Sequence, residues 1–377
     1  MLFRNIPGHQ VLKTRLIENV RKGKMPHARL FLGAEGSASL PLALAYAQYI
    51  QCLDRGDDDS CGVCNACLKN QKFIHPDLHF SFPFAGKKDD HSTLFIKEWR
   101  KMLLENPFVT LDGWMAGLSL ANKQLNININ ECHQIHSRLS MRPFESEFQI
   151  MIMWLPEFLG KEGNSLLKLV EEPSVRTQLL FVGENKDAIL GTIISRTQLT
   201  RIPVFTDQEV TTFIQEKCQL DEQAAAGIAF LSEGNLGMAL QLVGNISDDF
   251  SVQFSDWMQI CREGKPVRIV EWVDQFSRAG KAGPGRETQK SFLHFGLKMI
   301  REALLVFEGA KELLRMKADA ASSSWFSLIY PENAAKIVTE LDKSIYHIER
   351  NANPKILFLD VSLRLHVLLN MQPRVQS

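Results

Sequence analysis

The sequence has no excess of charge of either sign, which argues against a chain that binds polyanions over its whole surface. It contains 43 Lys and Arg residues and 43 Asp and Glu residues in a chain of 377, so the chain as a whole is not a binder of polyanions. Contact with nucleic acid would need a local patch. The chain also lacks an apolar run near the roughly 20 residues that span a bilayer, and MLFRNIPGHQ at its start lacks the charged region and apolar core of a signal peptide. We therefore expect a cytoplasmic protein with no membrane partner.

A second absence lies in residues 30–40, LFLGAEGSASL. An apolar run is followed by a glycine loop with Gly33 and Gly36 and then by another apolar run, which is the layout of a phosphate-binding loop. A working loop ends in Gly-Lys-Ser/Thr, because the lysine holds the β- and γ-phosphates and the hydroxyl holds magnesium. Here the last two positions are Ser39 and Leu40. We expect a degenerate loop without bound ATP; the alternatives are a plain turn before a helix, or weak anion binding by backbone N–H groups.

Four of the seven cysteines form one cluster, Cys52, Cys61, Cys64 and Cys67, with the spacing C-x8-C-x2-C-x2-C. Two-residue gaps bring thiolates into the tight turns that tetrahedral zinc requires, and four sulfur ligands leave no position open for water. In a reducing compartment such a cluster indicates a metal site rather than disulfides. The pattern predicts a structural Zn²⁺ ion, with an iron–sulfur cluster or buried free thiols as the alternatives.

Other residues of the same types receive plainer interpretations. His75 lies near the cluster in HPDLHF, where we expect it to cap the entry to a strand rather than bind metal. Cys132, Cys218 and Cys261 lie in apolar or helical stretches and are expected to be small buried residues.

Strand-like and helical stretches alternate over residues 1–205 and predict a parallel α/β sheet. The expected strands include ARLFLG, HPDLHFSFPF, QLNININ, EFQIMIMWL, TQLLFVGEN and TIIS. GNSLLKLVEEP is expected to be a short helix that Asn164 caps and Pro173 ends. Residues 84–124 are an irregular insertion with short helices and no evident role.

From residue 206 the pattern becomes helical, which predicts a small helical domain at 206–265 and a further helical domain at 266–377. RAGKAGPGRE, residues 278–287, is expected to be a linker or long turn. The last helix should have Asn353 as its cap and Pro354 in its first turn. The predicted fold class is therefore α/β plus all-α.

Five segments resemble, in sequence order, bacterial clamp-loader subunits of the AAA+ class. They are KMPHARLFLGAEG, the four-cysteine insertion, HPDLHF, NSLLKLVEEP and TIISRTQLTRIP. With the helical part, the likeness covers nearly the whole chain and is weakest over 84–124. It implies an AAA+ P-loop-type sheet domain at 1–205 with a zinc module at 52–67, a helical lid domain at 206–265 and a helical collar (oligomerisation) domain at 266–377.

The resemblance also locates a second missing motif. In ATP-hydrolysing members a buried strand ends in acidic residues that bind magnesium and activate water, whereas QIMIMWLPEF has Met153 and Trp154 at those positions. We expect Glu157, past Pro156, not to point back at the site. EGNLGMAL, residues 233–240, resembles a helix start where motor subunits often have a nucleotide-sensing arginine, and it contains none. These losses predict a chain without intrinsic ATPase activity.

The SRT tripeptide, expected to end the strand TIIS, resembles the Ser-Arg-Cys motif of the family with Thr197 in place of cysteine. In such assemblies this arginine reaches the ATP of a neighbouring subunit and stabilises charge on the γ-phosphate. The resemblance implies an arginine finger at Arg196, with Arg201 less favoured; without it, a surface arginine is the simpler interpretation. Glu171 and Glu172 end a helix, where the dipole disfavours anions, so we expect interface burial, bonds to arginines, or plain solvation.

The implied function is that of the stator subunit of a clamp loader within a DNA polymerase III (DNA-directed DNA polymerase) holoenzyme. Its implied partners are motor (gamma/tau-type) and delta-type subunits and, through the assembled complex, primed DNA and the sliding clamp. One alternative is an ATP-hydrolysing motor subunit with divergent motifs. Another is a free-standing zinc protein that binds nucleic acid, against which the neutral charge and the few aromatic residues near the cysteines argue.

Overall fold

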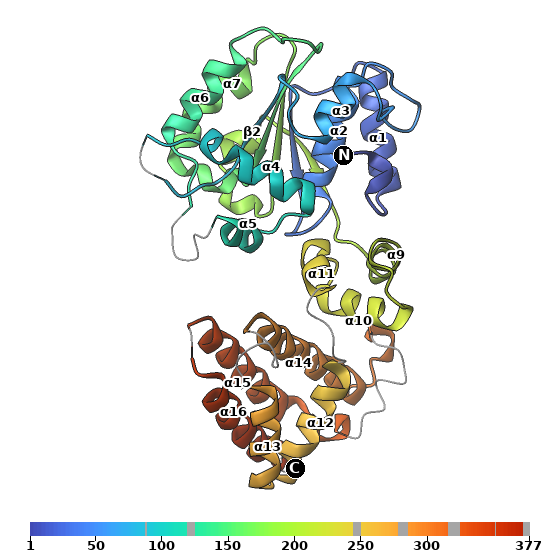
Figure 1. The fold of residues 1–377 in the computed structure, drawn as a ribbon, viewed down its shortest axis with the longest axis vertical. Coiled ribbons are helices and arrows are strands. Elements are labelled where there is room, and N and C mark those ends of the chain that lie inside the picture. The colour runs from blue at the N-terminus through green and yellow to red at the C-terminus, as the bar shows by residue number, and fades with distance from the viewer. Residues whose placement is uncertain are drawn as a thin grey trace. The chain divides into compact units, whose positions relative to one another are not determined.

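The computed structural model describes residues 1–86, 89–118, 125–243, 250–277, 286–315, 325–350 and 352–371. The chain forms two compact units, Met1–Gln241 and Leu242–Ser377, which are drawn in Figure 1. The first unit contains a β-sheet and the second is built of helices in the part that the structure describes. The domain limits near residues 205 and 265 stay a prediction.

Five parallel strands form one sheet in the first unit, in the order β2-β3-β4-β1-β5. The strands are β1 Ala28–Leu32, β2 Leu78–Ser81, β3 Gln149–Trp154, β4 Thr177–Gly183 and β5 Gln198–Arg201. β3 and β4 are buried along their whole length, as expected of central strands with helices on both faces. Leu32 pairs with Gly183, so the loops that follow β1 and β4 meet at the carboxyl edge of the sheet.

Helices cover this sheet, with α6 and α7 on one side and α1, α2 and α3 on the other (Figure 1). The helices of the sheet region are α1 Gln10–Arg21, α2 Ser39–Gln51, α3 Asn65–Gln71, α4 Ile96–Glu105, α5 Leu111–Gly117, α6 Ile129–Leu139, α7 Leu167–Glu171 and α8 Gly191–Ile194. They are followed by α9 Asp207–Cys218, α10 Glu222–Ser232 and α11 Leu236–Val243. α2, which starts at the degenerate loop, is buried on all sides, in keeping with its run of apolar residues.

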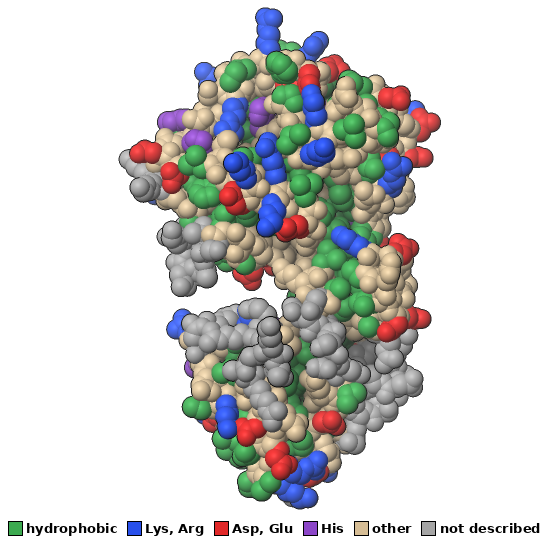
Figure 2. Space-filling model, viewed as in Figure 1, with side chains coloured by type: hydrophobic (Ala, Val, Ile, Leu, Met, Phe, Trp, Pro, Cys, Tyr) green, Lys and Arg blue, Asp and Glu red, His purple; other side chains and the backbone are tan. Residues whose placement is uncertain are grey.

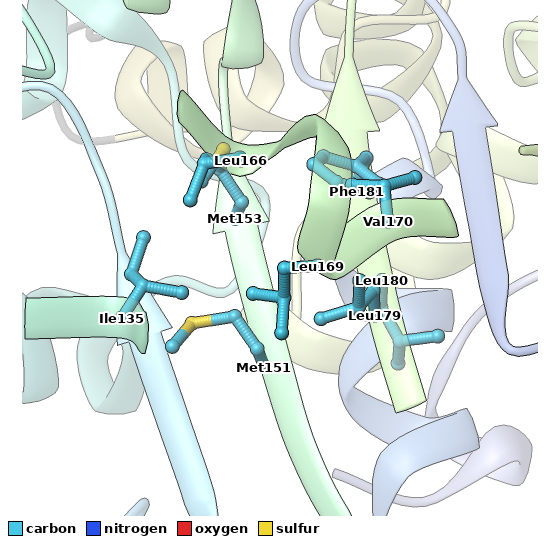
Figure 3. A pocket seen from close by; sticks show the side chains of 9 residues that line it. All are labelled: Ile135, Met151, Met153, Leu166, Leu169, Val170, Leu179, Leu180 and Phe181. Carbon is cyan, nitrogen blue, oxygen red and sulfur yellow. The ribbon is translucent and has the colours of Figure 1, made fainter. Parts of the chain in front are cut away.

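The space between β3, β4, α6 and α7 is filled by apolar side chains (Figure 3). These side chains are Ile135, Met151, Met153, Leu166, Leu169, Val170, Leu179, Leu180 and Phe181, and they enclose a cavity of about 10 Å³. A cavity of this size holds one water molecule at most. This part of the molecule is therefore packed core and not a ligand site.

The second unit is a set of helices around an aromatic core. Its helices are α12 Phe250–Glu263, α13 Pro266–Phe276, α14 Arg286–Phe307, α15 Pro331–Glu349 and α16 Pro354–Leu369. The ring centroids of Phe276 and Phe292 lie 4.5 Å apart, and Phe358 lies 4.9 Å from Phe276. The Asn353 side chain accepts hydrogen bonds from the first backbone N–H groups of α16, which confirms the predicted cap. Residues 278–285 of the predicted linker lie outside the described residues, and α14 begins at Arg286.

The predicted class, a parallel α/β domain followed by helices, is confirmed. Within the described ranges, none of the helices combines the length and apolar character needed to cross a membrane.

Two predicted strands are wrong. TIIS forms the short helix α8 because the Leu190 carbonyl accepts hydrogen bonds from the N–H groups of Ile193 and Ile194, and β5 starts only at Gln198. QLNININ contributes an isolated bridge between Phe84 and Asn126 in its described part. The next residues turn into α6, whose first turn is capped by the Asn128 side chain.

The predicted cap of the NSLLKLVEE helix is also wrong. Asn164 lies inside a 3-10 segment, Pro156–Leu166, that runs directly into α7. α7 starts at Leu167 without a side-chain cap. The chain is already helical when it reaches α7, so Asn164 has no free helix end to cap.

Candidate nucleotide site, arginine and metal centre

The loop after β1 is filled by its own serine hydroxyls. Ser37 Oγ and Ser39 Oγ lie 2.9 Å apart, and both side chains are 4% exposed. A Cβ atom on Gly33 would lie 2.5 Å from Ser39 Oγ, so the loop is closed tightly at the point where a nucleotide-binding loop has its lysine. Leu40, at the position of the missing magnesium ligand, is 3% exposed and packs in α2. Ser39 therefore supplies no positive charge for a triphosphate, and Leu40 supplies no oxygen ligand for its metal.

The start of α11 lies directly on this loop. The Leu236 N–H donates to the Gly36 carbonyl at 3.1 Å. Gly36 has a φ of 65°, and a Cβ atom there would come within 1.7 Å of Asn235 Oδ1. Asn235 Oδ1 also accepts the Met238 N–H at 2.8 Å, which caps α11. The Asn235 side chain therefore occupies the space that a side chain at position 36 would take.

The side chains at the end of β3 are buried among apolar and aromatic residues. Met153 and Trp154, at the positions of the missing acids, are each 2% exposed. The Trp154 ring lies 5.1 Å from that of Trp99 in α4, and Trp99 stacks on Phe82 at 4.4 Å. An aspartate in place of Trp154 would put a charge into this aromatic cluster without a partner, which is strongly unfavourable.

The insertion at 84–124 covers the same region of the sheet in its described part. The Leu111 N–H donates to Glu35 Oε1 in the degenerate loop at 2.8 Å. Gln241 Nε2, in α11, donates to Thr110 Oγ1 at 3.4 Å. The insertion thus contacts both the loop after β1 and α11, and it contributes Trp99 and Trp114 to the aromatic cluster.

Glu157 corrects one prediction, because its carboxylate turns back to the carboxyl edge of the sheet. Its Oε1 accepts hydrogen bonds from the backbone N–H groups of Glu184 at 2.6 Å and Asn185 at 2.8 Å, just after β4. The reversal is made by Leu155, which adopts a left-handed conformation with φ 55° and ψ 63°. Sequence order alone could not show it, since leucine rarely adopts this conformation. The carboxylate therefore joins two loops at the sheet edge.

Glu184 is a carboxyl group whose ionisation the fold opposes. Burial, with the charges of Glu35 and Glu157 added, raises its pKa to about 8. An unfolded glutamate titrates near 4.3, so between these two values the folded chain holds a proton that the unfolded chain has lost. Stability must then fall as the pH rises through this window, by at most about 1.4 kcal/mol per pH unit.

We expect Glu184→Gln to remove most of this fall. The variant should have a flatter stability profile from about pH 5 to about pH 8, and it should exceed the natural chain in stability at the upper end, since no charge then has to be buried. Urea unfolding of both chains across this range measures the effect. Equal pH slopes would contradict the assignment.

Arg196 lies in the turn between α8 and β5, and its guanidinium is held by its own chain. Nε donates to Glu171 Oε1, at the end of α7, at 2.6 Å, and Nη2 forms an ion pair with the same oxygen at 2.5 Å. Nη1 donates to the Thr192 carbonyl at 3.0 Å and to Ser195 Oγ at 3.2 Å. The Arg196 side chain remains 35% exposed, so it stands at the surface. Of the three expectations for Glu171, a bond to a nearby arginine is confirmed.

The other arginine candidate has a different setting. Arg201 is the last residue of β5 and is exposed, and it pairs with Leu32 across the sheet. Residues 233–240 contain the start of α11 as expected, and the notable side chain there is Asn235 rather than an arginine.

The four cysteines come together as predicted. The sulfur atoms of Cys52, Cys61, Cys64 and Cys67 all lie within 4.8 Å of one another, with 3.6 Å between Cys52 and Cys61 and 3.9 Å between Cys61 and Cys67. Tetrahedral zinc with Zn–S bonds near 2.3 Å places its sulfurs about 3.8 Å apart, so the group fits a single zinc ion.

Backbone geometry and charge also favour a metal at this centre. The Cys64 N–H donates to Cys61 Sγ, and the Cys67 N–H to Cys64 Sγ, which orients the sulfurs from two tight turns. Burial raises the pKa of the Cys52 and Cys67 thiols, and a divalent cation would supply the charge that holds them as thiolates. His75 lies apart from this group: its Nδ1 accepts the Asp77 N–H just before β2, which confirms the predicted strand cap.

Sequence reasoning missed the residues that pack against the loop after β1, α11 and the end of β3. Asn235 and the insertion residues Trp99, Thr110 and Trp114 act through contacts between distant parts of the chain. The available signal was the presence of two tryptophans in an insertion next to a strand that ends in Trp154.

Comparison with known proteins places the chain among replication proteins. The family model described as "DNA polymerase III, delta subunit" matches residues 8–206. DNA polymerase III subunit delta' of Escherichia coli is 23% identical over 364 residues, which cover 93% of this chain and 92% of that protein. The Bacillus subtilis subunit delta' is 27% identical over 184 residues, covering 48% of this chain and 44% of that protein.

Gamma subunits of DNA polymerase III match the chain as well. DNA polymerase III subunit gamma of Buchnera aphidicola is 22% identical over 247 residues, covering 64% of this chain and 57% of that protein. The chain thus spans about half the length of the Bacillus and Buchnera relatives. A solved gamma subunit-related protein of Thermotoga maritima is 14% identical, with 94% of this chain and 99% of that one covered and a TM-score of 0.42; at this score the likeness supports no functional argument. Since the family model matches more than half of its residues, the chain belongs to the DNA polymerase III, delta subunit family.

Proposed function

We propose that this chain is the non-hydrolysing, delta prime-type (stator) subunit of a bacterial DNA polymerase III clamp loader. In this role it presents Arg196 to the ATP of a neighbouring motor subunit and helps to load the sliding clamp onto primed DNA during replication. The proposal rests on family membership together with the closed nucleotide site.

The single observation that best supports a non-hydrolysing role is the filled loop after β1. Ser39 and Leu40 supply neither the lysine nor the metal ligand, and Asn235 occupies the space over Gly36. A charge-assisted hydrogen bond to a phosphate contributes about 1.5–3 kcal/mol, and each is lost here. Trp154 removes the metal-binding acids independently. A chain with both losses has no means to hold Mg·ATP.

The described part of the insertion connects the loop after β1 with α11. In a nucleotide-binding protein of this class, ATP lies between the sheet and the lid and links them. Here Thr110 and Leu111 of the insertion contact α11 and the loop residue Glu35 instead. We propose that the insertion takes over this linking role and keeps the subunit in one shape throughout the ATP cycle of its neighbours.

Arg196 is proposed as the finger because it stands at the surface, in the turn between α8 and the edge strand β5. A finger arginine increases the rate of phosphoryl transfer by about 10³–10⁵ where it has been measured. The four cysteines are proposed to hold a structural zinc ion, since all four positions of a tetrahedral shell are taken by the chain.

The second candidate function is an ATP-hydrolysing motor subunit. It is favoured by the match to gamma subunits, which the family comparison alone does not separate from the delta' matches. The side chains at the site favour the non-hydrolysing subunit, because a motor subunit needs cationic and acidic groups where this chain has Ser39 and Trp154.

The test is reconstitution with candidate motor subunits of the same organism. The chain alone should hydrolyse no ATP, and its addition should raise the turnover of the motor subunits several-fold, since it supplies the arginine that their terminal site lacks. Turnover by the chain alone that is abolished by changes in residues 33–40 would favour the motor function instead.

A further inference from the structure

The guanidinium of Arg196 has few donors left for a phosphate. An arginine offers five N–H donors, and three hydrogen bonds and one ion pair within the chain already engage Nε, Nη1 and Nη2. A finger that stabilises a γ-phosphate needs its donors directed at the phosphate oxygens. In the free chain these donors point at Glu171, Thr192 and Ser195.

From this geometry we infer that Glu171 is a positioning residue that restrains Arg196 in the free chain and releases it when a neighbour's nucleotide arrives. The inference rests on the proposed function, because it assigns a partner to the proposed finger. Both short contacts from Arg196 converge on one oxygen, Glu171 Oε1. Loss of that single contact frees Nε and Nη2 together.

The restraint is weak enough to be reversible. The Arg196 side chain is 35% exposed and that of Glu171 45% exposed, and ion pairs at such exposure are screened by water. The γ-phosphate of ATP carries more negative charge than one carboxylate, and its oxygens accept several guanidinium hydrogen bonds at once. Exchange of Glu171 for phosphate is therefore favourable only when a loaded neighbour is present.

The sequence offers a matched control. Glu172, the next residue, is also a glutamate and is exposed at the end of α7. Glu171→Gln and Glu172→Gln remove the same charge from the same helix end, and only the first removes the charge that pairs with Arg196.

The experiment measures ATP turnover at saturating ATP in the complex reconstituted from full-length chains. Glu171→Gln should raise turnover by up to about fivefold, because the exposed Glu171–Arg196 ion pair then no longer competes with the γ-phosphate for the arginine. Glu172→Gln should leave turnover unchanged. In an Arg196→Ala background Glu171→Gln should have no effect, because the residue acts through the arginine. A second readout uses the free chain: solvent exchange of the Arg196 Nε–H, measured by NMR, should be faster in Glu171→Gln only.

The opposite results would contradict either the restraint by Glu171 or the proposed function itself. Unchanged or lower turnover in Glu171→Gln, or an equal rise in the Arg196→Ala background, overturns the restraint while leaving the finger in place. Turnover that is unaffected by Arg196→Ala overturns the proposed function itself. An unchanged Nε–H exchange rate in a Glu171→Gln chain of normal thermal stability also overturns the restraint.

Discussion

Replacing Arg196 by alanine should lower ATP hydrolysis at the site of the neighbouring motor subunit by about 10³-fold or more, since arginine fingers contribute 10³–10⁵ to such rates. The guanidinium is planar and always charged, and lysine does not reproduce its forked hydrogen bonds, so Arg196→Lys should recover little of the loss. The chain should still fold and assemble, because the Arg196 side chain is partly exposed and its hydrogen bonds within the described residues are to Glu171, Thr192 and Ser195.

The measurement is single-turnover hydrolysis in a complex whose other ATP sites are inactivated, so that only the site next to this chain reports. Arg201→Ala is the matched control, because Arg201 is an exposed arginine at the end of the neighbouring strand. It should leave the rate near that of the natural chain. If Arg201→Ala abolishes turnover and Arg196→Ala does not, the finger has been assigned to the wrong arginine.

Loss of zinc should have the largest effect on stability. Structural zinc sites contribute about 10–16 kcal/mol of apparent binding free energy in small metal-binding peptides, and Cys67 is a fully buried member of the group of four. Cys67→Ser should bind no zinc and should lose the ordered structure of residues 52–71. The β-sheet itself should stay folded, because none of its strands lies within residues 52–71.

Metal content by atomic emission and backbone hydrogen exchange measure this effect. The natural chain should hold one zinc per molecule, and its cysteine turns should be protected from exchange. Cys218→Ser, in α9 and apart from the cluster, is the control and should keep the metal. A Cys67→Ser chain with the same protection over residues 52–71 as the natural chain would show that the site is not structural.

The parts of the fold that could be predicted are those that local sequence determines. β3 and β4 are nearly continuous apolar runs and are buried throughout, and the four cysteines lie close enough in sequence for their turns to meet. Asn353 caps α16 because an asparagine before a proline-led helix has its acceptor next to the first N–H groups. In these cases the neighbouring residues settle the structure.

The errors arise where a local preference competes with the path of the chain. TIIS has β-branched residues that favour a strand, yet the chain must turn there to bring β5 beside β1, and a single helical turn makes that bend. Glu157 faces the sheet edge only because Leu155 takes a left-handed conformation. Asn235 closes the loop after β1 through contact with Gly36, and no sequence pattern connects these two residues.

Titration of Mg·ATP into the isolated, zinc-loaded chain, followed by heat or by the fluorescence of a labelled ATP, tests the proposed loss of the nucleotide site. We expect no saturable binding at millimolar nucleotide, because Ser39 supplies no positive charge and Asn235 occupies the space over Gly36. Stoichiometric, magnesium-dependent binding that a change at Gly33 abolishes would contradict it.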